Sequence, residues 1–191
     1  EEVDPFIVET SLHGARPGNP NIDARLDASP LFADVTRYAY GSGGVQVFVE
    51  TDLIKKFQAG FEAGVEEVNA DATVEVKYLT PDGDFSGFND SAKGQTVSSG
   101  LYDAGADVIF HAAGGSGAGV FSAAAEADRL AIGVDSDQYF QVDEAEQECM
   151  LSSMLKRVDV GVYDTIAALA SDEFEAGVQV FDLSNGGIDY S

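Results

Sequence analysis

Residues 105–138, GADVIFHAAGGSGAGVFSAAAEADRLAIGVDSDQ, decide the fold. A short apolar run at 107–112 is typical of a strand that is buried on both faces of a parallel sheet. Four glycines in six positions follow at 114–119, an alanine-rich helical segment spans 120–127, and a second apolar run at 130–134 leads to Asp135 and Asp137. We therefore expect a strand, a glycine turn, a helix and a strand. The turn and the acids would lie at the carboxyl ends of strands, where open α/β sheets bind ligands.

The same alternation continues on both sides of this stretch. Apolar, β-branched runs predict strands at 44–49, 73–79, 150–155 and 177–183. Thr51 or Asp52 is positioned to cap an amphipathic helix that continues to residue 69, and further helices are predicted at 91–104 and 158–169. Only a short strand at 6–8 and an undecided element at 31–40 are suggested before residue 44. Alternating strands and helices favour an α/β fold, a parallel sheet with helices on both faces.

The charge of the chain narrows the possible partners. Its 191 residues carry 34 Asp and Glu against 10 Lys and Arg, a formal net charge of -24. Such a surface should repel DNA, RNA and anionic lipid. It fits either an acidic interface for a basic partner or, as we favour, a surface adapted to high salt. The sequence has no apolar run of transmembrane length and no signal peptide, so we expect a soluble chain. Cys149 is the only cysteine, and we expect it to be structural.

The glycine turn allows two interpretations. In GGSGAG, Gly115 and Gly117 fit the first two positions of a dinucleotide fingerprint, and Asp135 follows Gly115 by 20 residues, where a ribose-binding acid is expected. The third glycine position falls on Val120, however. The alternative is that the glycines only allow strand and helix to pack closely.

Two other features could carry chemistry. The loop at 81–90 contains Phe85 and Phe88, either of which could stack on a flat ligand or anchor the loop on the sheet. The acids of this loop, Asp82, Asp84 and Asp90, do not follow the EF-hand spacing, so we predict no metal site. Lys156 ends an apolar strand, where it could bind an anion or ligand hydroxyls, or belong to a surface Lys-Arg pair.

No catalytic constellation is recognisable. His13 lies in a turn-like, solvated context, whereas His111 lies inside an apolar run and is predicted to be a satisfied core histidine. Ser116 lies in the glycine turn without an evident histidine partner, and none of the hydrolase, zinc-protease or phosphate-loop motifs occurs. We therefore predict a protein that is not an enzyme and needs no cofactor.

Five blocks in order resemble the basic membrane protein family of substrate-binding lipoproteins, which is similar to the purine nucleoside receptors of ABC importers. They are LIKKFQAGFEAGV, GFNDSAKGQ, GADVIFHAAGGSGAGV, AIGVDSDQ and LSSMLKRVDVGVYDTI, within residues 44–190. The resemblance implies a type I periplasmic-binding-protein fold, in which two α/β lobes close on a ligand at a hinge crossed three times. It implies a reduced or incomplete first lobe at 1–43, a ligand-binding lobe at 44–156, a helix returning to the first lobe at 157–173, and a final strand and C-terminal segment at 174–191.

The resemblance also implies roles for individual residues. The family's purine-stacking aromatic falls on Phe88, with Phe85 as second choice. The ribose-binding acid falls on Asp135, with Asp137 as second choice, and the ribose-binding lysine falls on Lys156. Ala113, Gly114 and Gly115 would line the same cleft. On this basis Asp135 and Lys156 are expected to reach one ribose from different sides of the hinge.

The function implied by the resemblance is capture of a nucleoside, with a purine nucleoside favoured, and its delivery to an ABC permease. The protein would be a monomer on the extracellular face of the membrane or in the periplasm, anchored as a lipoprotein. Hinge closure would be the mechanism, without chemistry. Two alternatives are an NAD-dependent oxidoreductase that uses the glycine turn at 114–119 and Asp135, and a cytosolic ligand sensor of the same fold.

Overall fold

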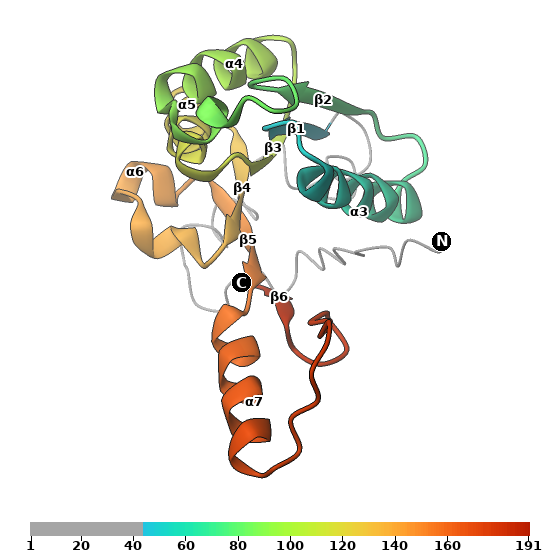
Figure 1. The fold of residues 1–191 in the computed structure, drawn as a ribbon. Coiled ribbons are helices and arrows are strands. Elements are labelled where there is room, and N and C mark those ends of the chain that lie inside the picture. The colour runs from blue at the N-terminus through green and yellow to red at the C-terminus, as the bar shows by residue number, and fades with distance from the viewer. Residues whose placement is uncertain (1–43) are drawn as a thin grey trace.

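Parallel strands form the centre of the computed structural model, which describes residues 44–191 (Figure 1). The sheet has the order β2-β1-β3-β4-β5-β6. Its parallel members are β1 (Gly44–Phe48), β2 (Val74–Tyr78), β3 (Val108–Ala112), β4 (Leu130–Asp135) and β5 (Met150–Lys156). The predictions for residues 6–8, 31–40 and His13 lie outside the described residues. Five of the six strands predicted from residue 44 onward, and their parallel pairing, are confirmed.

Helices cover both faces of this sheet. Helix α3 (Asp52–Val68) lies on one face, and α4 (Ser91–Asp103) and α5 (Gly117–Ala127) lie on the other (Figure 1). Thr51 caps α3 as predicted, because its hydroxyl accepts a hydrogen bond from the Ile54 N–H at 3.1 Å. A short helix, α6 (Glu144–Gln147), interrupts the acidic connection before β5.

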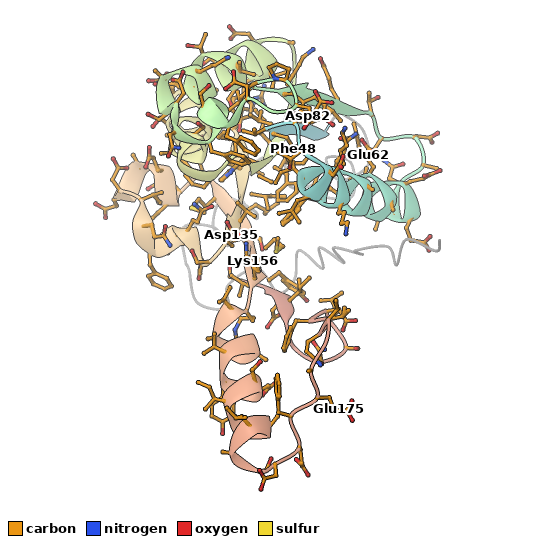
Figure 2. All side chains as sticks on the ribbon, in the orientation of Figure 1. Phe48, Glu62, Asp82, Asp135, Lys156 and Glu175 are labelled. Carbon is orange, nitrogen blue, oxygen red and sulfur yellow. The ribbon has the colours of Figure 1, made fainter. Side chains whose placement is uncertain are left out.

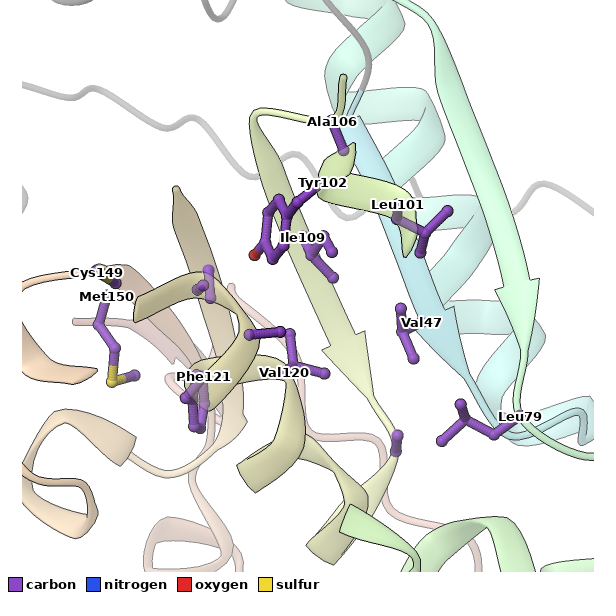
Figure 3. Packing of buried hydrophobic residues seen from close by; sticks show 14 of the residues in the cluster. Val47, Leu79, Leu101, Tyr102, Ala106, Ile109, Val120, Phe121, Cys149 and Met150 are labelled. Carbon is purple, nitrogen blue, oxygen red and sulfur yellow. The ribbon is translucent and has the colours of Figure 1, made fainter. Parts of the chain in front are cut away.

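Successive residues along each strand point to opposite faces, so the core has two halves. Val47 and Ile109 join the half beneath α4 and α5, whereas Phe48 and Phe110 join the half beneath α3. Figure 3 shows the first half, where buried side chains of β1, β3 and the two helices meet. Cys149 is buried within it, as expected of a structural cysteine.

Glycines let α4 and α5 approach each other closely. A Cβ at Gly119 would overlap the carbonyl oxygen of Ser91, and a Cβ at Gly94 would overlap the carbonyl oxygen of Ser116. Only glycine therefore fits at these contacts without a shift of backbone.

Residues 44–156 form the α/β body of the structure. The chain beyond β5 extends away from this body (Figure 1). Helix α7 (Val158–Ala170) has no buried residue, and β6 (Ile188–Tyr190) then returns antiparallel to β5. The strand predicted at 177–183 is wrong: Gly177 has a φ of +145°, Val178 is 93% exposed, and the sheet receives residues 188–190 instead. None of the described helices has the length and apolar character needed to cross a membrane.

Candidate ligand-binding site

Two oppositely charged side chains meet at the carboxyl edge of the sheet. Asp135 is the last residue of β4 and Lys156 the last of β5, and Lys156 Nζ lies 2.9 Å from Asp135 Oδ1. Both side chains are 51% exposed, so the pair remains accessible from solvent. Figure 2 shows the two residues next to each other, where the body meets α7. They lie on neighbouring strands of one sheet and pair with each other, rather than facing each other across a hinge.

The glycine turn lies at the end of β3, the strand beside β4. Ala113 is fully buried and Gly114 has a φ of +55°. Phe88 lies directly against this turn, because a Cβ at Gly114 would be 3.2 Å from both its ring and its carbonyl oxygen. The structure thus places Phe88 beside the turn that contains Ala113, Gly114 and Gly115.

The two loop phenylalanines differ in exposure. Phe88 is half-buried and packs against both halves of the core, whereas Phe85 is 64% exposed. Their rings stack with centroids 6.4 Å apart and planes 16° apart. Phe88 therefore anchors the loop and borders the glycine turn. The exposed ring of Phe85 stacks on the ring of Phe88.

Ser116 joins this loop to the glycine turn. Its fully buried hydroxyl donates to the Gly87 carbonyl oxygen at 2.6 Å and accepts from the Asp90 N–H at 2.7 Å. The contact explains why a serine lies among the glycines. The Ser116 hydroxyl therefore has a structural role and not that of a nucleophile.

Packing also accounts for two glycines of the turn, of which Gly117 belongs to the proposed dinucleotide fingerprint. A Cβ at Gly117 would overlap the His111 ring, and Gly119 is pressed against α4. The close-packing interpretation of the turn is thus favoured over dinucleotide binding.

His111 is buried as predicted, but it is not satisfied. Its ring meets Phe121 edge-on with centroids 5.0 Å apart, and neither ring nitrogen has a hydrogen-bond partner among residues 44–191. Burial lowers the pKa of His111 to about 4, against smaller opposing effects of the Gln138 carboxamide and Asp135. The imidazole is therefore neutral at pH 7.

The loop acids have structural tasks. Asp84 accepts from the Ser86 N–H at 3.0 Å and begins a short 3₁₀ helix, and Asp90 accepts from the Lys93 N–H at 2.9 Å and caps α4. Asp137 is half-buried and precedes another 3₁₀ helix, at Gln138–Gln141. No group of His, Cys, Asp or Glu suited to a metal ion occurs in the described part of the chain.

Sequence reasoning missed Gln138 and Ser153. The Gln138 Oε1 accepts from the Val134 N–H at 2.7 Å, and the Gln138 N–H donates to the Ser153 hydroxyl at 3.2 Å. Together they fasten the turn that carries Asp135. Neither residue lies in a periodic pattern, and the only available signal was that Gln138 directly follows the acidic turn.

Comparison with known proteins places these residues in a family. Residues 36–191 match the model of the Bmp family, described as ABC transporter substrate-binding protein PnrA-like. The ABC transporter nucleoside-binding protein BmpA of Lactococcus lactis subsp. cremoris is 35% identical over 161 residues, which cover 77% of this chain and 43% of that protein. The CD4+ T-cell-stimulating antigen of Listeria monocytogenes is 36% identical over 144 residues, covering 69% of this chain and 39% of that protein.

Solved structures agree on the fold. An ABC transporter solute-binding protein from Aeropyrum pernix K1 superposes with a TM-score of 0.66 at 24% identity, covering 90% of this chain and 45% of the other. The predicted periplasmic-binding-protein-like fold is thereby confirmed. The chain spans less than half the length of these relatives.

Proposed function

The chain belongs to the Bmp family of ABC-transporter substrate-binding proteins, and from this premise we propose that it binds a nucleoside, with a purine nucleoside favoured. The family consists of binding proteins, in agreement with the predicted lack of enzymatic activity. The nucleoside assignment is supported by the name of the Lactococcus relative. The observation that carries it is the accessible Asp135–Lys156 pair beside the glycine turn.

The pair has the chemistry that a sugar requires. A carboxylate can accept hydrogen bonds from two neighbouring hydroxyls, and an ammonium group can donate to a hydroxyl of the same sugar. In the structure the two charges neutralise each other at 2.9 Å and are half-exposed. A ribose would therefore meet a donor and an acceptor held side by side. Asp137, two residues further along the chain, remains the second choice for the acid.

The base would lie towards the glycine turn. Phe88 packs directly against Gly114 and Gly115, and Phe85 stacks on Phe88, so the two rings provide aromatic surface at the same edge of the sheet. A purine offers a larger face for stacking than a pyrimidine, so purine nucleosides are favoured.

The wider setting of the site is also part of the proposal. In the two-lobed fold, hinge closure would trap the nucleoside, and the exposed apolar side of α7 would pack on the first lobe. Delivery to an ABC permease, a lipid anchor and a monomeric, extracytoplasmic protein fit the family. The net charge of -24 fits a salt-rich medium, where the Debye length falls to about 3 Å at 1 M salt.

Calorimetry with adenosine, guanosine, inosine and uridine in high salt tests the proposal. Asp135→Asn and Lys156→Met should each weaken binding about ten- to a hundredfold, because each removes charge-assisted hydrogen bonds. Lys77→Met is the matched control, since Lys77 pairs with Glu75 on β2 and both side chains are 49% exposed. Unchanged binding by both site variants would place the ligand elsewhere, and absence of binding to any nucleoside would overturn the proposed ligand class.

A further inference from the structure

Asp135 occupies a strained turn. Its φ is +70°, which a non-glycine residue rarely adopts. The Ser136 N–H donates to the Val134 carbonyl oxygen at 2.9 Å, so the hydrogen bond spans one residue and closes a γ-turn centred on Asp135. The form with positive φ is the rarer and more strained of the two γ-turns. Such strain persists only where the surroundings hold the backbone in place.

The Gln138 side chain holds one end of this turn. Its Oε1 accepts from the N–H of Val134, the residue before Asp135, at 2.7 Å. The backbone N–H of Gln138 donates to Ser153 Oγ on β5 at 3.2 Å. Gln138 therefore ties the end of β4 to β5, the strand that ends in Lys156.

Gly133 provides the space for this contact. A Cβ at this position would lie 2.8 Å from Gln138 Oε1 and 2.7 Å from Ser153 Oγ. Only a residue without a side chain leaves the carboxamide where it reaches Val134. Gly133 on β4, Ser153 on β5 and Gln138 at the start of a 3₁₀ helix are thus fitted to one another around the turn.

We infer that Gln138 is a positioning residue, which holds the strained turn so that the Asp135 carboxylate stays beside Lys156. The inference rests on the proposed function, in which Asp135 binds ligand hydroxyls. Gln138 itself need not touch the ligand. Its effect on affinity is exerted through the backbone on either side of Asp135.

Gln138→Met tests this inference, because methionine keeps the volume and loses the acceptor. Gln147→Met is the matched control: the Gln147 side-chain amide donates to the Tyr139 carbonyl oxygen at 2.9 Å, in the same 3₁₀ helix as Gln138 but not on the turn at Asp135. We expect the Val134 amide to exchange with solvent about tenfold faster in Gln138→Met. We expect nucleoside affinity to fall about tenfold in Gln138→Met and to stay unchanged in Gln147→Met. Gln138→Glu, which restores an acceptor, should return the Val134 amide to slow exchange.

The amide exchange and the three-bond coupling between the amide and α protons of Asp135 need no ligand. If the parent binds no nucleoside, the proposed function fails, and these two measurements still decide whether Gln138 holds the turn. If the parent binds and Gln138→Met binds equally well, the inference is wrong. Equal losses of affinity in Gln138→Met and Gln147→Met would also overturn it. Should Gln138→Met not fold, Gly133→Ala applies the same test by displacing the carboxamide, and unchanged exchange at Val134 would refute the inference.

Discussion

The α/β body at 44–156 and the arm at 157–191 have similar apolar patterns and different surroundings. In the body, Ile109, Phe121 and Val120 are at most 1% exposed between sheet and helices. In the arm, Val162, Ile166 and Leu169 recur at helical spacing as well, yet they are 54%, 62% and 64% exposed. An apolar stripe indicates which side of a helix is suited to packing against another part of a protein. It does not indicate what covers it.

The arm is held to the body mainly by hydrogen bonds, and Ile188 of β6 packs, partly buried, against the core. Strand β6 pairs with β5, and the Ser191 N–H donates to the Ser153 carbonyl oxygen at 3.1 Å. Ser191 adds hydrogen bonds to Ser152 and Ser153 at 2.8 and 3.1 Å. The candidate site lies at this junction, since Lys156 is both the end of β5 and the residue before the arm.

Truncation of matched isoleucines should give the largest difference between body and arm. Ile109→Ala leaves a cavity in a fully buried site and should lower the free energy of unfolding by about 2–5 kcal/mol. Ile166→Ala removes an exposed side chain and should change it by less than about 0.5 kcal/mol. Urea denaturation measures both. A similar loss in the two variants would mean that the α7 stripe is covered in solution.

Acid should destabilise the body through His111. Its pKa is lowered from 6.5 to about 4, so the unfolded state binds more protons between these values. The contribution of neutral His111 to the free energy of unfolding is fully present above pH 6.5. It is lost as the pH falls towards 4, which lowers the free energy of unfolding by roughly 3 kcal/mol. His111→Leu should flatten this decline in denaturation measured from pH 7 to 4. Carboxylates titrate in both proteins, so a decline of equal steepness would show that His111 has no such role.

Adding a methyl group at two helix glycines should give effects of opposite sign. Gly119→Ala meets the backbone of α4 and should destabilise the body by about 1–3 kcal/mol. Gly161→Ala in α7 meets only the Phe181 ring at 3.6 Å, an ordinary contact, and should stabilise by about 0.5–1 kcal/mol. Thermal unfolding compares them. A stabilising Gly119→Ala would contradict the close packing of α4 on α5.

The smallest effect is expected at the junction itself. Lys156→Met breaks an ion pair whose two side chains are half-exposed, so the free energy of unfolding should change by no more than about 1 kcal/mol. The same substitution is expected to weaken nucleoside binding strongly. A variant that loses stability as severely as it loses affinity would make Lys156 a structural rather than a ligand-binding residue.

Local sequence patterns were sufficient to predict most of the helices and strands. Strands β1 to β5, the Thr51 cap and the helices α3, α4, α5 and α7 follow from apolar periodicity and capping residues, which act over a few positions. The segment at 177–183 has the same apolar character and forms no strand, because strand formation needs a partner edge. In this chain β5 pairs with residues 188–190 instead.

Within the candidate site, the order of strands in the sequence already indicates which residues gather at the carboxyl edge. Parallel strands that follow one another bring Phe88, Gly114, Asp135 and Lys156 to one edge, and the family resemblance selects them. Three features become visible only in the folded protein: Asp135 pairs with Lys156 within one sheet, Gly117 and Gly119 serve packing, and Gln138 secures the turn. These features depend on distances between side chains and backbone of different elements. Such distances are fixed only when the elements pack together.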